Sequence, residues 1–502
     1  MRSGNGFLGL VQGLMSLYQF FFNQLQAARA EKKAKELEAF MDEAQASGQL
    51  GDGRLATMKD AERAGLFNMN GLYLGTFNGR MVFFNGDGPL LTYLRTGGGK
   101  GINYVLPNLA HVRDRSLIVI DVKDGENAFA TYRLRASLPG HTCICLNPFG
   151  LHDLPNTRIN PLQVLIDIVN AGRKIDTEAA DLAHILCPVV KNEQTWPRDG
   201  AIDFLSVTME YLAHLDQENC NLAGLWAKVQ ASDEDMDTTF VMMESCGITG
   251  IARRAAAMRS IFQNAVTQWA AYKSVLNKAV TAFEAEKSLA NATLVNEFDF
   301  RRLKHEPCTV YIMVRSDKLD VAAPWISLII NVAIEAIAAE RGPLRTTLLL
   351  DEFAQLPPGH AFMRTLRLYR GKGVQPWVFS QGRQSLEGKW SKPDVLEIED
   401  QAQCFTMKDT QDPALLRDIS LWSGNMTVLS QGQSHSGGKL EAANASLSES
   451  KRPVLQSEDV LALGNSQIVR IANQPHLFVI STRPYFKIAP WMVWIRDVRS
   501  IH

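Results

Sequence analysis

The chain has 502 residues, of which 46% are hydrophobic and 21% are charged, and its formal net charge is −1. This composition is ordinary for globular proteins and excludes wholesale disorder, a collagen-like repeat and a coiled coil, while the length predicts two to four compact units. The near-neutral charge carries no argument for nucleic acid or an anionic membrane, so any such contact requires a local basic patch.

Residues 1–60 are expected to form a helical segment that does not cross a membrane. Residues 7–22, FLGLVQGLMSLYQFFF, fall short of the roughly 18 to 20 apolar residues that span a bilayer, and Gln12, Ser16 and Gln19 interrupt them. Two interpretations stay open. The segment is an amphipathic helix that packs on the protein or a partner, or one that lies on a bilayer surface.

Residues 61–160 and 304–502 are expected to form the two parts of one α/β domain. Short apolar runs rich in β-branched residues alternate there with turns and helical stretches, which is typical of a mostly parallel sheet with crossover helices. The expected strands are Leu90–Tyr93, Ser116–Asp121, Thr142–Leu146, Thr309–Val314, Thr346–Leu350, Trp377–Ser380, Gln403–Met407, Gln467–Ile471 and Leu477–Ile480.

Residues 161–303 are expected to form an all-α domain inserted into that sheet domain. Strand-like runs nearly vanish in this region, while apolar residues recur at helical spacing. A second irregular segment, residues 430–450, is rich in Ser, Gly, Gln and Asn, and we expect a mobile loop because this composition buries little apolar surface.

A glycine-rich segment, Thr96-Gly97-Gly98-Gly99-Lys100-Gly101, follows the first expected strand and precedes a helical stretch. Glycines allow backbone N–H groups to turn toward phosphates, the helix N-terminus adds a favourable dipole, and Lys100 supplies a cation for the β- and γ-phosphates. The segment therefore predicts a P-loop that binds ATP.

Two positions depart from the usual Gly-x-x-x-x-Gly-Lys-Ser/Thr pattern. Leu94 stands where the first glycine belongs, and Gly101 replaces the hydroxyl that would bind Mg²⁺. The alternative interpretation of the segment is a flexible glycine-rich turn.

A second signal lies at Asp351 and Glu352, which end the expected strand Thr346–Leu350. In P-loop ATPases the Asp of such a pair organises Mg²⁺ and the Glu polarises the attacking water. Adjacent carboxylates after a strand are also a frequent start of a helix, but together with Lys100 they predict Mg²⁺-dependent ATP hydrolysis.

Two further features follow this strand. Arg364, Arg367 and Arg370 recur at three-residue spacing, so one of them could reach a neighbouring subunit's γ-phosphate, or the stripe could face DNA phosphates or solvent. Gln381 ends the strand Trp377–Ser380, at the edge where open α/β sheets bind ligands, and is a candidate sensor of the γ-phosphate.

In this order the segments resemble the coupling-protein family of conjugative type IV secretion systems, the TraG-like P-loop ATPases. The likeness covers about residues 80 to 490. Lys followed by Gly is common at this point in the family, so Gly101 weighs less against activity than the generic motif suggests. The segments that carry the likeness are Thr96–Gly101 with Pro107-Asn108-Leu109, Leu117–Asp121 with Lys123, Asn147-Pro148-Phe149, Trp196 with Arg198-Asp199-Gly200-Ala201, Leu349–Phe353, Arg370-Gly371-Lys372-Gly373 through Gln381, and Lys451-Arg452-Pro453-Val454-Leu455 with Glu458-Asp459-Val460.

The resemblance implies a RecA-like P-loop nucleotide-binding domain with an all-α domain, assembling as a homo-oligomeric ring such as a hexamer. It implies recruitment of relaxase-bound DNA or effector proteins to a type IV secretion channel, in the bacterial cytoplasm at the cytoplasmic face of the inner membrane. The family usually begins with two membrane-spanning helices, whereas residues 1–60 offer none. Under this interpretation Lys100, Asp351, Glu352, Gln381 and Arg370 are catalytic, Thr96 to Gly101 bind ATP, and Asp351 binds Mg²⁺.

Two other functions compete with this one. The first is a catalytically weak or inactive soluble adaptor that recruits secretion substrates, which the missing hydroxyl at Gly101 favours. The second is a DNA translocase that works wholly in the cytoplasm.

Overall fold

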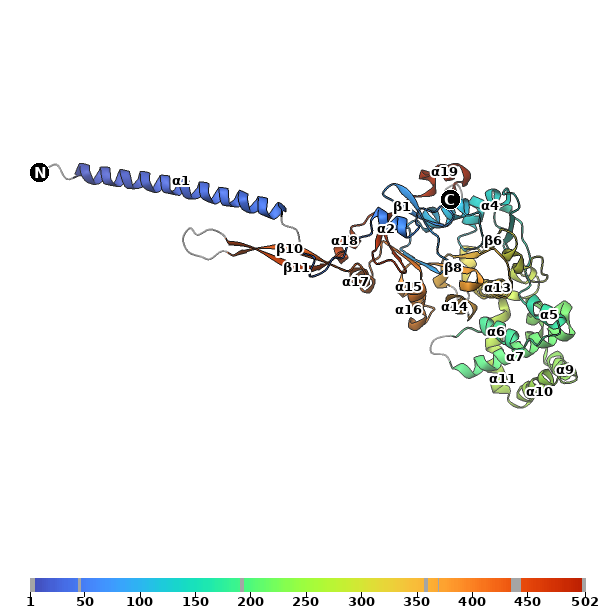
Figure 1. The fold of residues 1–502 in the computed structure, drawn as a ribbon. Coiled ribbons are helices and arrows are strands. Elements are labelled where there is room, and N and C mark those ends of the chain that lie inside the picture. The colour runs from blue at the N-terminus through green and yellow to red at the C-terminus, as the bar shows by residue number, and fades with distance from the viewer. Residues whose placement is uncertain are drawn as a thin grey trace. The chain divides into compact units, whose positions relative to one another are not determined.

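The computed structural model describes residues 5–43, 47–189, 194–355, 360–368, 370–434 and 444–498 (Figure 1). The chain divides into two compact units. One unit consists of residues 1–55 and 416–460, and the other consists of residues 56–415 and 461–502. The second unit contains the predicted P-loop, Thr96–Gly101, with the strand before it and the helix after it.

In the described residues of the second unit, one sheet holds 11 strands in the order β2-β1-β13-β12-β9-β3-β8-β7-β4-β6-β5. The seven strands from β9 to β5 run parallel, and the four at the other edge pair antiparallel. The predicted α/β class with a mostly parallel sheet is therefore confirmed. The strands are β1 (Leu72–Phe77), β2 (Arg80–Phe84), β3 (Leu90–Leu94), β4 (Ser116–Asp121), β5 (Thr142–Leu146), β6 (Cys308–Met313), β7 (Thr346–Leu350), β8 (Val374–Ser380), β9 (Cys404–Lys408), β12 (Ser466–Ile471) and β13 (Phe478–Ser481).

Each of the nine expected strands corresponds to a strand of this sheet, with ends that shift by a few residues. The hairpin of β1 and β2 was not predicted. Its turn is Asn78-Gly79, and both residues have positive φ, at 48° and 81°. An Asn-Gly pair between two apolar runs is a strong hairpin signal, so the sequence contained the information that was missed.

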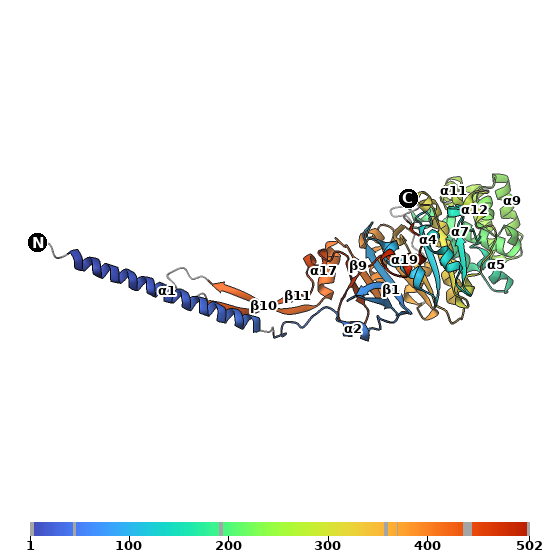
Figure 2. The ribbon, with the colours of Figure 1, turned by 90° about the horizontal axis from the view of Figure 1, so that it is seen from above.

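Between β5 and β6 the described chain forms only helices, which gather into one group coloured green in Figure 1 and stand together again in Figure 2. Their core includes aromatic side chains, and Phe204 packs edge-to-face on Trp269 with ring centroids 5.6 Å apart. The main helices are α5 (Gln163–Asn170), α6 (Asp176–Leu186), α7 (Thr195–Leu215), α8 (Leu222–Val229), α9 (Asp233–Glu244), α10 (Thr249–Asn264), α11 (Val266–Val280) and α12 (Ser288–Asn291).

Other helices connect the strands. Among the described residues one stretch, residues 316–339, is long and apolar enough to cross a membrane, but 72% of its apolar window is buried inside the molecule. The composition of this core helix therefore reflects burial in the protein. Helix α2 (Met58–Arg63) precedes the first strand and α19 (Trp491–Trp494) follows the last. The connecting helices are α3 (Leu106–His111), α4 (Glu126–Ala136), α13 (Leu319–Ala339), α14 (His360–Arg367), α15 (Arg383–Glu387) and α16 (Lys392–Gln401), while α17 (Pro413–Trp422) and α18 (Ser457–Leu461) lie where the chain passes between the units.

The first unit contains the helix α1 (Asn5–Glu43) and a hairpin of β10 (Asn425–Ser434) and β11 (Asn444–Pro453). The prediction of an irregular loop at residues 430–450 was wrong for the described part of this segment. Ten residue pairs align the two strands, from Asn425 opposite Pro453 to Ser434 opposite Asn444. Backbone pairing stabilises a strand whatever its side chains, so the polar composition concealed the hairpin. Residues 435–443 lie outside the described chain.

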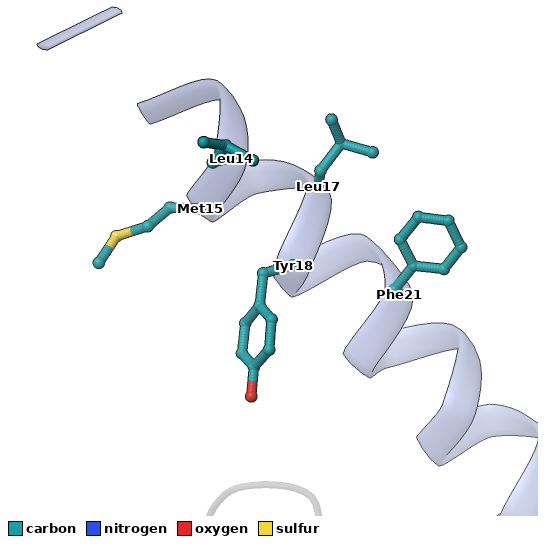
Figure 3. Close-up of a pocket in the computed structure, with 5 residues that line it drawn as sticks. All are labelled: Leu14, Met15, Leu17, Tyr18 and Phe21. Carbon is teal, nitrogen blue, oxygen red and sulfur yellow. The ribbon is translucent and has the colours of Figure 1, made fainter. Parts of the chain in front are cut away.

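The helix α1 exposes apolar side chains, five of which are drawn in Figure 3. At 100° per residue, Leu14, Leu17, Tyr18, Phe21 and Leu25 fall within one arc, and each is more than half exposed. The helix expected in this part of the chain is therefore present, and these apolar side chains are open to a bilayer or a partner.

Candidate functional site

The order of the parallel strands brings the predicted site together. β8 lies between β3, which precedes the glycine-rich loop, and β7, which precedes Asp351. The register pairs Tyr93 with Ser380 and Leu350 with Val378, so the carboxyl ends of the three strands lie at one edge of the sheet. Open α/β sheets bind ligands at this edge.

The glycine-rich loop has a backbone that suits glycine. Gly97 and Gly99 have φ of +80° and +85°, which other residues rarely adopt. At Gly98 an added Cβ would lie 2.5 Å from Cδ1 of Leu94, whose side chain is buried. Leu94, which departs from the usual pattern, therefore fills the space beneath the loop, and Gly98 is the residue that accommodates it.

Lys100 contacts both predicted carboxylates. Its Nζ forms an ion pair with Asp351 and lies 2.7 Å from Oε1 of Glu352. The side chains of Lys100, Asp351 and Glu352 are only 10%, 5% and 16% exposed. The structure thus joins the two sequence signals in one buried cluster of charges.

This environment shifts the pKa values of both partners in the direction that favours charge. Burial opposes the charge on Lys100, but Asp351 and Glu352 outweigh burial and raise the pKa of the ammonium group above its ordinary value. Burial likewise opposes ionisation of Glu352, but Lys100 and then Lys123 lower its carboxyl pKa. Glu352 is therefore ionised at neutral pH, as a general base must be.

The backbone of Glu352 is strained, because its φ is +51° and it is not glycine. Its N–H donates to Oδ1 of Asp351 over 2.9 Å. Strained residues of this kind cluster at functional sites, where the surrounding structure holds them.

The residues present fit a nucleotide with Mg²⁺. The left-handed glycines, Lys100 and the helix start after the loop provide a cradle for phosphates. Among the described residues no cluster of three His, Cys, Asp or Glu could hold a metal. Proteins usually hold Mg²⁺ with one or two carboxylates together with substrate phosphates and water, and Asp351 offers such a carboxylate beside Lys100.

Of the remaining predicted residues, Gln381 lies at the sheet edge of the site, whereas Arg364 and Arg367 pair with other side chains of the chain. Gln381 is exposed and directly follows β8, at the same sheet edge as Lys100. Arg364 is paired within the chain, with Asp181 at 2.8 Å and Glu335 at 3.1 Å. Arg367 is also paired, with Glu397. Both arginines therefore have internal partners.

Arg370 begins a short turn of helix after α14, and its side chain lies outside the described part of the structure. Thr96 is exposed at the head of the loop.

Two cations near the loop were not assigned a role from the sequence. Lys123 lies two residues beyond β4, and its Nζ is 3.5 Å from Oε1 of Glu352. Lys408 ends β9, the other neighbour of β3, and its Nζ donates to the carbonyl oxygen of Gly98 over 3.4 Å and to Thr482 over 3.0 Å. Lys123 follows a strand and Lys408 ends one, both at the carboxyl edge of the sheet, and that position was the available signal.

A buried network supports the segment after β8. Arg383 donates two hydrogen bonds to the carboxylate of Glu399, each 2.8 Å long, and the hydroxyl of Tyr93 on β3 donates to the same carboxylate over 2.7 Å. This network fixes the start of α15 against the strand that carries the phosphate loop.

Comparisons with known proteins identify the family and the fold. The family described as Type IV secretory system Conjugative DNA transfer matches residues 41–488. The chain belongs to this family. The resemblance found in its motifs is thereby confirmed, and the chain has a place in type IV conjugative transfer.

Solved structures with the same fold include the bacterial conjugative coupling protein TrwB. The unbound form, TrwBdeltaN70, has a TM-score of 0.61 and 16% identity, covering 86% of this chain and 92% of that chain. TrwB with the ATP analogue ADPNP has a TM-score of 0.62, and TrwB with ADP and Mg²⁺ has 0.61; both are 16% identical and cover 86% of this chain and 93% of theirs. A search of curated protein sequences found no match.

The replacement Gly101→Ser tests the departure at the end of the loop. An added Cβ at Gly101 meets no atom within 4 Å, and the residue begins a helical turn, so we expect the variant to fold with unchanged or slightly higher melting temperature. If Mg²⁺ binds beside this position, the hydroxyl should lower the Mg²⁺ concentration for half-maximal ATP turnover, whereas Gly101→Ala should not. Equal Mg²⁺ dependence in both variants would place the metal away from residue 101.

Proposed function

We propose that this chain is an ATP-hydrolysing coupling protein of a type IV secretion or conjugation system. The observation that carries the proposal is the meeting of Lys100 with Asp351 and Glu352, although Lys100 and Glu352 are 252 positions apart in the chain. Three charges buried together at the carboxyl edge of parallel strands, beside a left-handed glycine loop, are the parts that phosphoryl transfer requires.

The chain's own residues would divide the work. The loop from Thr96 to Gly101 would hold the phosphates, with Lys100 on the β- and γ-phosphates. Asp351 would hold Mg²⁺, which, when bound, neutralises charge on the phosphate oxygens. Glu352 would orient the attacking water and accept its proton, and Gln381 would sense the γ-phosphate.

Ring assembly is part of the proposal. Arg364 and Arg367 are paired within the chain, so Arg370 is the candidate for a contact with a neighbouring subunit's γ-phosphate. We propose a homo-oligomeric ring, such as a hexamer, that brings relaxase-bound DNA or effector proteins to the channel. Mixed rings test the arginine: Arg370→Ala subunits combined with Lys100→Ala subunits should recover activity, and no recovery would remove the shared site.

The deciding experiment is a turnover assay on the purified full chain, with Mg²⁺ and ATP, at protein concentrations that permit assembly and with and without DNA. Turnover that rises with assembly supports a motor. Absence of turnover under all conditions, with substrate recruitment retained, would show the adaptor instead. Fractionation and co-purification with secretion-channel components separate a coupling protein from a cytoplasmic DNA translocase.

We further propose that the chain works at the cytoplasmic face of the inner membrane and that α1 lies on the bilayer. Its exposed apolar side chains are followed by cations that include Arg29 and Lys32, which suit anionic lipid headgroups, while Lys35 pairs with Glu31 at 2.9 Å. The double replacement of Leu17 and Phe21 by Glu should lower the partition coefficient onto anionic vesicles, measured by flotation, by more than about 100-fold. The reason is that each buried apolar side chain contributes roughly 1.5–3 kcal/mol to the free energy of binding. Replacement of Ser16 and Gln19 by Glu, on the other side, is the control for added charge. Equal flotation of both variants would contradict this placement.

A further inference from the structure

One carboxylate oxygen of Glu352 is shared by two ammonium groups. Oε1 lies 2.7 Å from Nζ of Lys100 and 3.5 Å from Nζ of Lys123. The two lysines differ in freedom, since the Lys100 side chain is 10% exposed and the Lys123 side chain is 48% exposed. Glu352 therefore pairs with a buried lysine of the phosphate loop, Lys100, and with a half-exposed lysine outside that loop, Lys123.

The turn that carries Lys123 is held on both sides. Before it, the buried carboxylate of Asp121 accepts from the backbone N–H of Ala128 over 2.8 Å and from the backbone and side chain of Asn127. After it, the carboxylate of Asp124 accepts from the backbone N–H and hydroxyl of Ser316, over 3.0 and 2.8 Å. These contacts fix the backbone of Lys123 beside Glu352.

We propose that Lys123 is a positioning residue that retains Glu352 when Lys100 is released to the phosphates of a nucleotide. This inference rests on the proposed function. Lys100 is engaged by Asp351 and Glu352, so phosphates must compete with these carboxylates for it. Lys123 weakens the hold of Glu352 on Lys100, because it supplies Glu352 with a second partner and repels the ammonium group of Lys100.

The consequence concerns nucleotide affinity. If Lys123 is removed, Lys100 is the one of the two lysines that still pairs with Glu352. The ion pair between Glu352 and Lys100 then becomes stronger. Nucleotide then binds more weakly. If Glu352 has already lost its charge, Lys123 has nothing to divert from Lys100, and its removal should matter little.

A double-mutant cycle measures this dependence without turnover. The probe is a fluorescent, non-hydrolysable ATP analogue with Mg²⁺, and the proteins are full chains with Lys123→Ala, Glu352→Gln or both. We expect Lys123→Ala to weaken binding by about two- to five-fold in the presence of Glu352, in keeping with a half-exposed ion pair, and to have no effect in the Glu352→Gln background. Lys123→Arg should restore the wild-type affinity.

Lys318→Ala is the matched control, because Lys318 is 46% exposed, follows the neighbouring strand β6 and pairs with Asp317. It should leave affinity unchanged in both backgrounds. Equal weakening by Lys123→Ala with and without Glu352 would mean that Lys123 touches the nucleotide itself, and no weakening in either would mean that it does not act on Glu352. Either result would overturn the inference about Lys123 and leave the proposed function standing, because the protein would still bind nucleotide. Loss of analogue binding by the wild type would instead remove the proposed function, and this inference with it.

Discussion

Glu352→Gln should lower ATP turnover by about 10²- to 10⁴-fold, the usual contribution of general acid–base catalysis. The replacement keeps the shape of the side chain and removes its charge, so it cannot accept a proton from water. Nucleotide affinity should be unchanged or higher, because Lys100 is then released from one of the two carboxylates that contact it. The measurement pairs kcat from steady-state hydrolysis with the Kd of a fluorescent ATP analogue.

Glu340→Gln is a suitable control for this experiment. Glu340 directly follows α13 and precedes β7, and it pairs with His305 at 2.9 Å, so it lies before the amino end of the strand that Glu352 follows. Its replacement should leave both kcat and Kd unchanged. If Glu352→Gln lost affinity and turnover in equal proportion, Glu352 would be a nucleotide ligand, and the assignment as general base would fail.

Lys100→Ala should abolish measurable nucleotide binding and also destabilise the free protein. The replacement removes a cation that is 10% exposed and leaves Asp351 and Glu352 buried without it. Breaking a buried ion pair from one side costs about 3–5 kcal/mol, since the remaining charge is uncompensated. Thermal unfolding without nucleotide should therefore show a clear fall in melting temperature.

The loss of stability should depend on pH in a defined direction. In the wild type the pKa of Glu352 is lowered, so its contribution is present above the ordinary pKa of 4.5 and is lost as the pH falls through the lower folded value. In Lys100→Ala the lowering by Lys100 disappears and burial remains, which favours the protonated carboxyl. The melting temperature of the variant should therefore fall, relative to wild type, as the pH rises from 5 to 8.

Two variants separate this effect from general damage. Lys100→Ala combined with Glu352→Gln should be more stable at pH 8 than Lys100→Ala alone, because one buried charge has been removed. Lys304→Ala removes another buried lysine, which donates to the carbonyl oxygen of Lys372 over 2.9 Å. It should lower stability without affecting nucleotide affinity. A Lys100→Ala protein that binds nucleotide with wild-type affinity would end the motor hypothesis.

The sequence by itself determined the α/β class, the nine strands and the two nucleotide signals. These features are local: apolar runs of strand length, a glycine loop before a helix, and carboxylates directly after a strand are written in neighbouring residues. The family also followed from the order of such segments. The polar hairpin of β10 and β11 was missed because its strands have no apolar pattern, and pairing of their backbones does not require one.

Only the tertiary structure decided which charges meet. The insertion of β8 between β3 and β7 sets the spacing between Lys100 and Glu352, and the placement of β4 beside β7 brings Lys123 to the same carboxylate. Folding likewise gave Arg364 and Arg367 partners on other helices, which the three-residue spacing of the arginines could not show. Contacts of this kind depend on strand order and on the docking of helices far apart in the chain, and a single sequence does not encode either in a local pattern.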